Sequence, residues 1–102
     1  MICLYICLIN YYGMQFDFDN NKSLINKKKH NIDFHEAQKL WEDPLRIEIP
    51  AKYIDEQRIL VIANYNNRIW SAVITSRDDK IRIISVRKSR ENEKKIYYSQ
   101  RI

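Results

Sequence analysis

The side chains of this sequence that could bind or transform an anion are concentrated in two segments. The segment Lys22–His30 holds four lysines, one histidine and no acidic residue. The segment Val86–Ile102 holds six basic residues against two acidic ones. Lysine and arginine bind phosphate groups, and histidine exchanges protons near neutral pH. Because the stretch between them, Asp33–Glu56, carries seven acids against three bases, folding could gather the two basic segments into one basic face.

The composition limits the classes of protein to which the chain can belong. A chain of 102 residues and 12.4 kDa is the size of one domain. Its 45% hydrophobic and 30% charged residues are typical of a globular protein. The net charge of +5 and the pI near 9.3 suit a polyanionic or acidic partner. These values fit a small enzyme acting on nucleic acid, a nucleic-acid binder or a basic adaptor, and argue against a transporter or a multidomain enzyme.

Residues 1–13 differ from the rest of the chain. They carry no charge, and they contain both cysteines, Cys3 and Cys7, which are too few for a disulfide framework or a zinc site. The apolar run Ile2–Ile9 is shorter than the roughly 20 residues that a membrane helix needs. We therefore expect no metal, no cofactor, no membrane association and a cytoplasmic location. We expect a single domain over residues 14–102, with residues 1–13 an over-extended N-terminus; an extra edge segment or a weak targeting sequence are the alternatives.

Two helices are predicted in the first half of the domain, after a short strand over 15–18. The first helix runs to about His30, and we expect its Leu24 and Ile25 to face the core. The second helix is predicted over 34–42, where aromatic and aliphatic residues recur at helical spacing. Both helices would supply apolar side chains to one face of a sheet.

Strand signals separated by turn residues follow the helices. Asn66-Asn67 can adopt the positive φ of a two-residue hairpin loop, and Asp78-Asp79 marks a second turn. The tail over 89–99 returns to a helical composition. The predicted fold class is α+β, a small antiparallel β-sheet with two N-terminal helices packed on one face and a C-terminal helix. The predicted strands of the second half are 46–49, 58–65, 69–76 and 81–87.

A series of motifs from Met14 to about Tyr98 resembles the BrnT family, the toxins of a type II toxin–antitoxin system. Several motifs in the right order make this resemblance more specific than any one motif would. The chain departs from the family pattern at Phe18, Asn31 and Ala63, where the family usually has Trp, Gly and Gly. The matching residues are Phe16-Asp17-Phe18-Asp19, Lys22, Asn26, Lys29-His30, Phe34, Glu36-Ala37, Asp43, Glu56, Arg58, Ile81–Lys88, Glu93 and Tyr97.

This resemblance implies both a fold and an activity. It implies a RelE-like fold and a metal-independent endoribonuclease that inhibits translation. It also implies neutralisation by a BrnA-type antitoxin with a ribbon-helix-helix domain, through which the complex would bind operator DNA. The alternative is a catalytically inactive protein that binds RNA or acts as a corepressor partner of the DNA-binding antitoxin.

Metal-free RNA cleavage needs a base for the 2′-hydroxyl proton, cations for the phosphorane and an acid for the leaving oxygen. Given the resemblance, the residue types and positions indicate candidate residues for these roles. The candidate catalytic residues are His30, Arg82, Arg87, Glu93 and Tyr97, and the candidate RNA-binding residues are Lys29, Lys88 and Arg90.

The two arginines of the last predicted strand are not equivalent candidates. Because Arg82 and Arg87 are five residues apart, they lie on opposite faces of a regular strand unless a bulge intervenes. Arg87 is the better candidate, since it lies at the strand end beside the basic tail. Arg82 can instead form a structural ion pair with Glu56 or another acid.

The remaining candidates also have structural alternatives. His30 can bond the last free carbonyls of its helix, and Tyr97 can pack the last helix on the sheet. Lys29 and Lys88 can be solvated lysines. The hypothesis that carries the ribonuclease interpretation is that folding brings Lys29, His30, Arg87 and Lys88 together around one phosphodiester.

Overall fold

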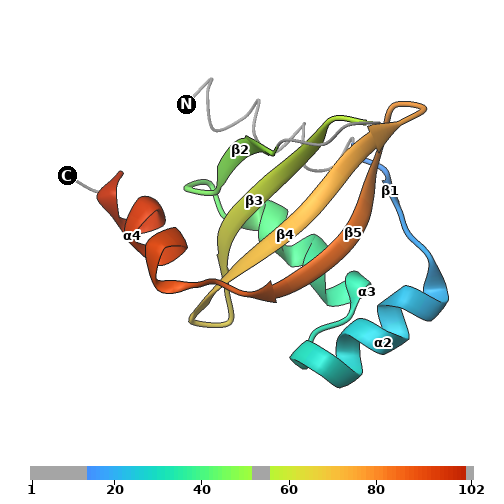
Figure 1. Ribbon diagram of the computed structural model, residues 1–102, viewed down its shortest axis with the longest axis horizontal. Helices are drawn as coiled ribbons and strands as arrows, with labels where there is room; N and C mark the ends of the chain where they lie inside the picture. The colour runs from blue at the N-terminus through green and yellow to red at the C-terminus, as the bar shows by residue number, and fades with distance from the viewer. Residues whose placement is uncertain (1–13, 52–55, 101–102) are drawn as a thin grey trace.

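The computed structural model describes residues 14–51 and 56–100, which form a five-stranded sheet with helices on both sides (Figure 1). The predicted over-extended N-terminus, residues 1–13, lies outside the described residues. Within the described ranges, no helix is long and apolar enough to cross a membrane.

The order of the elements confirms the predicted order, and the α+β fold class is also confirmed. One detail differs, because the second predicted helix is an α-helical turn that continues as a 3₁₀ helix. From the N-terminus the elements are β1 (Phe16–Asp17), α2 (Asn20–His30), α3 (Phe34–Ala37), the 3₁₀ helix η1 (Gln38–Glu42), β2 (Ile47–Ala51), β3 (Arg58–Tyr65), β4 (Arg68–Arg77), β5 (Lys80–Lys88) and α4 (Glu91–Ser99).

The strands β3, β4 and β5 form the antiparallel meander that the turn residues predicted. Asn66 and Asn67 both have positive φ, as do Asp78 and Asp79. Positive φ at both central residues gives a turn whose twist matches that of the strands it joins. The strand order is β1-β5-β4-β3-β2, and β1 is parallel to β5. Pro50 fits within β2 because β2 is an edge strand.

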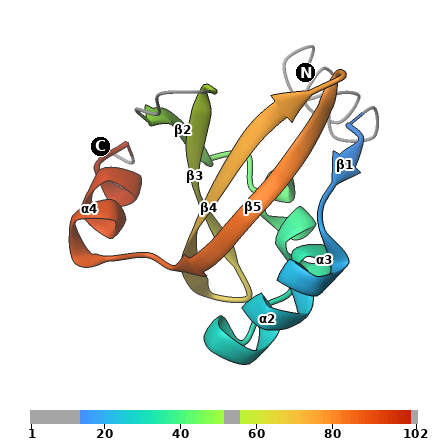
Figure 2. The ribbon, with the colours of Figure 1, turned by 45° about the vertical axis from the view of Figure 1, so that its right-hand side comes forward.

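The sheet packs apolar side chains on both faces. On one face Val61, Ala72 and Val86 belong to the main core, with α3 and η1. On the opposite face Ile62 and Tyr97 belong to a smaller cluster that includes a residue of α4. The N-terminal helices and α4 therefore lie on opposite sides of the sheet, as Figure 2 shows.

Helix α2 is polar on its inner side and leaves its two apolar residues exposed. Leu24 is 65% exposed and Ile25 is 52% exposed, so the prediction that they face the core is wrong. The buried residues are Ser23 and Asn26. The Ser23 hydroxyl accepts a hydrogen bond from the backbone N–H of Phe34. The inner side of α2 is polar because it lies against backbone groups that need hydrogen-bond partners.

A bulge places two arginines of β5 on the same face of the sheet. The pairing of β4 with β5 shifts register near the middle of the two strands, with Arg82 opposite Thr75 and Arg87 opposite Ser71. Because Thr75 and Ser71 are four residues apart on β4, their side chains share one face. Arg82 and Arg87 therefore share that face too. They would lie on opposite faces of a regular strand, and the bulge makes the difference.

Candidate functional site

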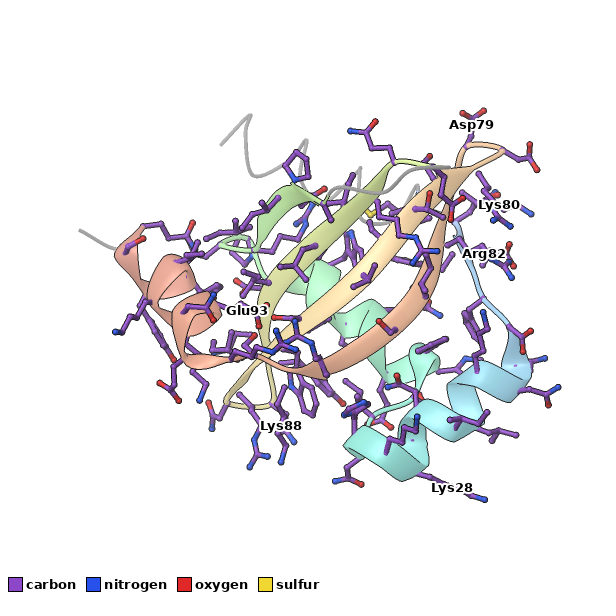
Figure 3. The ribbon with its side chains drawn as sticks, viewed as in Figure 1. Lys28, Asp79, Lys80, Arg82, Lys88 and Glu93 are labelled. Atoms are coloured by element: carbon purple, nitrogen blue, oxygen red, sulfur yellow. The ribbon has the colours of Figure 1, made fainter. Side chains whose placement is uncertain are left out.

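The two basic segments of the sequence meet in one pocket of about 360 Å³, referred to below as the basic pocket. The last turn of α2 forms one side of the pocket, and the end of β5 forms the other. Figure 3 shows Lys28 and Lys88 at the same end of the molecule. The lining residues are Lys27, Lys28, Lys29, His30, Asn31, Arg87 and Lys88.

A buried asparagine on α2 positions the two sides of this pocket. The Asn26 side chain donates to the carbonyl of Val86 at 2.9 Å and accepts from its N–H at 3.2 Å. It also donates to the carbonyl of Ile32 at 2.8 Å. Helix α2 then ends at Asn31, whose φ of 63° is the left-handed conformation that asparagine tolerates at helix ends. The basic residues of α2 and of β5 therefore come directly after Asn26 and Val86 in the sequence, and the contact between these two residues sets their positions.

Most of the ammonium groups of the basic pocket face solvent without an acidic partner. Lys27 is the exception, since its Nζ lies 2.5 Å from Glu36 Oε1. This hydrogen bond is the largest cause of the raised pKa of Lys27. In the part of the chain that the structure describes, Lys29 and Lys88 form no side-chain ion pair or hydrogen bond. Their charges are thus available to an anion.

Arg87 is held at the pocket by a carboxylate beneath the strand end. Its Nη1 and Nη2 donate to Glu93 Oε1 and Oε2 at 2.7 and 2.8 Å. Glu93 is buried and also accepts from Ser71 Oγ and the backbone N–H of Arg90. The hydrogen bond from Arg87 is the main cause that lowers the pKa of Glu93 to about 2, and the same contact raises the pKa of Arg87. Glu93 is therefore ionised near neutral pH and has no proton to donate.

The residue types in the basic pocket suit phosphate chemistry. Lysine and arginine can neutralise phosphate oxygens, and the half-buried His30 adds an imidazole to the same pocket. Among the described residues, no group of three or more His, Cys, Asp or Glu side chains could hold a metal ion.

The structure brings together four of the residues nominated from the sequence, Lys29, His30, Arg87 and Lys88. It links Glu93 to them through the ion pair with Arg87. The exposed Arg90 lies two residues beyond Lys88 and is the N-cap residue of α4.

Two nominated residues lie outside the basic pocket. Arg82 is near the opposite end of β5 (Figure 3) and forms an ion pair with Asp17 at 2.7 Å, so the alternative of a pair with an acid other than Glu56 is confirmed. Tyr97 is 1% exposed, and its hydroxyl donates to Asp43 Oδ2 at 2.5 Å. This contact attaches α4 to the end of η1, as expected from the packing alternative for Tyr97.

The sequence did not identify the buried residues that hold Glu93, and through it Arg87, in place. Ser71 Oγ lies 3.0 Å from Glu93 Oε1 and 2.7 Å from Ser89 Oγ, and both serines are buried. A serine in the otherwise apolar run of β4 was the available signal. Asn26 was recognised only as a motif position, and no local signal marked its contact with the backbone of β5.

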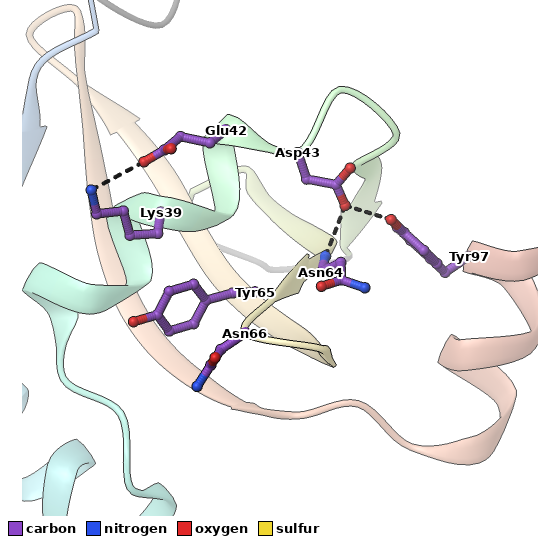
Figure 4. A pocket seen from close by; sticks show the side chains of 7 residues that line it. All are labelled: Lys39, Glu42, Asp43, Asn64, Tyr65, Asn66 and Tyr97. Carbon is purple, nitrogen blue, oxygen red and sulfur yellow. Dashed lines mark hydrogen bonds and ion pairs between the residues drawn. The ribbon is translucent and has the colours of Figure 1, made fainter.

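A second pocket of about 380 Å³ lies at the end of β3 (Figure 4). Its fixed point is Asp43, whose Oδ2 accepts from the Tyr97 hydroxyl and from the backbone N–H of Asn64 at 2.8 Å. Asp43 Oδ1 accepts from the N–H of Leu45. The residues that line this second pocket are Lys39, Glu42, Asp43, Asn64, Tyr65, Asn66 and Tyr97.

Comparison with known proteins agrees with the motif resemblance. A family model described as the ribonuclease toxin, BrnT, of a type II toxin–antitoxin system matches residues 18–93. This range includes every side chain that lines the basic pocket. A search of curated proteins finds no match.

Proposed function

The chain belongs to the BrnT family of ribonuclease toxins from type II toxin–antitoxin systems, and from this premise we propose that it cleaves RNA in the basic pocket without a metal ion. The observation that supports this proposal is the convergence of Lys29, His30, Arg87 and Lys88 from two distant segments on one pocket. Cleavage of RNA would inhibit translation, which is the toxic effect we assign to the protein.

The proposed reaction is transfer of the phosphoryl group to the adjacent 2′-hydroxyl. His30 accepts the 2′-hydroxyl proton while the 2′-oxygen bonds to phosphorus and the bond to the 5′-oxygen breaks. Arg87 and Lys88 stabilise the charge of the phosphorane. The leaving 5′-oxygen takes a proton from water or an ammonium group, and the products are a 2′,3′-cyclic phosphate and a 5′-hydroxyl. An imidazole and the cations of the basic pocket can support these steps.

The other nominated residues have supporting roles in this proposal. Glu93 is a positioning residue, because its fixed negative charge holds the Arg87 guanidinium. Arg82 and Tyr97 have structural roles, since Asp17 and Asp43 engage their polar groups. The exposed Arg90 extends the RNA-binding surface beyond Lys88.

Membership of this family gives the chain an antitoxin partner. We propose that the antitoxin is of the BrnA type, with a ribbon-helix-helix domain through which the complex binds operator DNA in the cytoplasm. A positively charged chain, at +5, suits an acidic antitoxin segment that would cover the basic pocket.

The test is cleavage of single-stranded RNA by the purified protein with and without EDTA. We expect equal rates in both conditions and a loss of about 100-fold or more in His30→Gln. His35→Gln is the matched control, because His35 is exposed on α3 and lies outside the basic pocket. Binding of RNA without cleavage by the wild-type protein would favour the alternative of an inactive RNA-binding partner. Loss of activity in EDTA would refute metal independence.

A further inference from the structure

The second pocket differs from the basic pocket because its charges are already compensated. Lys39 Nζ lies 3.2 Å from Glu42 Oε2. The Asp43 carboxylate accepts three hydrogen bonds from neighbouring groups. An anion would therefore find little uncompensated positive charge there, and a neutral polar ligand fits the pocket better.

Three side chains of the second pocket offer hydrogen-bonding groups that the described residues do not use. The side-chain amides of Asn64 and Asn66 make no hydrogen bond within the described residues, and neither does the Tyr65 hydroxyl. Each amide carries two donors and one acceptor oxygen. Figure 4 shows Asn64, Tyr65 and Asn66 along the end of β3, with Lys39 and Glu42 across from them.

A backbone contact links Tyr65 of the second pocket to the strand pair that ends in the basic pocket. Trp70 lies opposite Lys88 in the pairing of β4 with β5, and its indole N–H donates to the carbonyl of Tyr65 at 3.1 Å. Lys27 and Lys88 both line the basic pocket. Tyr65 of the second pocket is thus linked through Trp70 to Lys88 of the basic pocket.

We propose that the second pocket binds one nucleobase of single-stranded RNA, next to the phosphodiester held in the basic pocket. This inference rests on the proposed function, because it assigns the base specificity of the same reaction. Proteins read single-stranded RNA by splaying out a base, packing it on an aromatic ring and hydrogen-bonding its edge. Tyr65 provides the ring, and Asn64 and Asn66 provide amides that can pair with a base edge.

The floor of the second pocket is rigid enough to select a base. Asp43, which directly follows η1, accepts hydrogen bonds from Asn64 of β3, from Tyr97 of α4 and from Leu45 in the turn that follows. Asn66 begins a two-residue turn in which both residues have left-handed backbone conformations. Groups held in place before binding discriminate between ligands better than groups that must reorganise.

The test compares two neighbouring asparagines in the same turn. Asn66→Gly removes the amide that lines the second pocket, and Asn67→Gly removes the amide beside it that does not. Glycine adopts positive φ without strain, so both variants keep the turn. Each protein is incubated with a pool of random-sequence single-stranded RNA, and the cleavage sites are mapped by sequencing.

We expect wild type and Asn67→Gly to share one base preference beside the cleaved bond. In Asn66→Gly this preference should fall by about tenfold. An unchanged preference in both Asn66→Gly and Asn64→Ala would overturn the inference. So would variants that cleave normally but no longer bind the antitoxin, because that result assigns the pocket to protein docking.

Failure of the proposed function gives a different result. If the wild-type protein cleaves no RNA, binding of a 2′-deoxy oligonucleotide pool by wild type, Asn66→Gly and Asn67→Gly tests the second pocket alone. A base preference that Asn66→Gly loses and Asn67→Gly keeps would support the nucleobase site without catalysis. Equal binding profiles would refute it.

Discussion

The Asn26 side chain bonds both backbone polar groups of Val86, as a neighbouring strand would. β1 pairs with β5 only at Ile81 and Arg82. Farther along the same edge of β5, the Asn26 side chain makes the hydrogen bonds that a strand would make. The last turn of α2 and the last two residues of β5 follow this contact directly. One side chain therefore determines how the two basic segments of the chain face each other.

We predict that Asn26→Leu destabilises the fold although it adds an apolar side chain. The substitution removes three buried hydrogen bonds and leaves the polar groups of Val86 and the carbonyl of Ile32 without their partner. The expected loss is about 3 kcal/mol in the free energy of unfolding, measured with urea. Asn21→Leu, at an exposed position of the same helix, should change stability by less than about 0.5 kcal/mol. Similar losses in both variants would contradict this assignment.

The unexpected orientation of α2 leads to a prediction about leucines. Leu24 is 65% exposed on α2, whereas Leu40 is fully buried in the main core. Leu40→Ala should cost about 2–5 kcal/mol of unfolding free energy, because it leaves a cavity. Leu24→Ala should cost less than about 0.5 kcal/mol. A large loss in Leu24→Ala would show that Leu24 has a partner in the folded protein.

The parts of the fold that local sequence encodes were predictable. Asn66-Asn67 and Asp78-Asp79 identify their turns because few residues other than glycine, asparagine and aspartate tolerate positive φ. Asn31 ends α2 for the same reason. The two basic segments were also visible in the sequence. They meet because the fold places the end of α2 beside the end of β5.

The parts that depend on tertiary partners were not predictable. Leu24 and Ile25 suggest an inward apolar face, but α2 lies against a strand edge whose backbone requires Asn26 instead. The face that Arg87 occupies depends on a bulge between two strands, which no residue type in β5 specifies. Likewise, nothing local to Tyr97 indicates that its hydroxyl reaches Asp43, which is distant in the sequence.

The two end residues of β5 allow a matched test of the basic pocket. Lys88 lines the pocket, whereas Lys80 is an exposed lysine at the far end of the same strand. Lys88→Gln should weaken RNA binding several-fold and reduce the slope of log affinity against log salt by about 0.7, as expected for the loss of one phosphate contact. Lys80→Gln should leave that slope unchanged. Equal effects of the two substitutions would indicate that RNA responds to net charge and not to the pocket.

The ion pair between Arg87 and Glu93 should make stability sensitive to acid. Hydrogen bonding to Arg87, above all, lowers the pKa of Glu93 in the folded protein to about 2, from an ordinary value of 4.5. A depressed folded-state pKa stabilises the protein fully above the unfolded pKa, and this stabilisation is lost as the pH falls from about 4.5 to about 2. At 1.36 kcal/mol per pKa unit, the contribution is about 3 kcal/mol.

We therefore predict that Glu93→Gln is less stable than wild type near neutral pH, and that the difference narrows by about 3 kcal/mol towards pH 2. Urea unfolding between pH 2.5 and 7 measures this, because that interval covers most of the range from the folded-state pKa of about 2 to the ordinary value of 4.5. Glu91→Gln is the control, because the Glu91 side chain is 85% exposed, and its curve should run parallel to that of wild type. Parallel curves for Glu93→Gln as well would mean that the ion pair does not stabilise the fold.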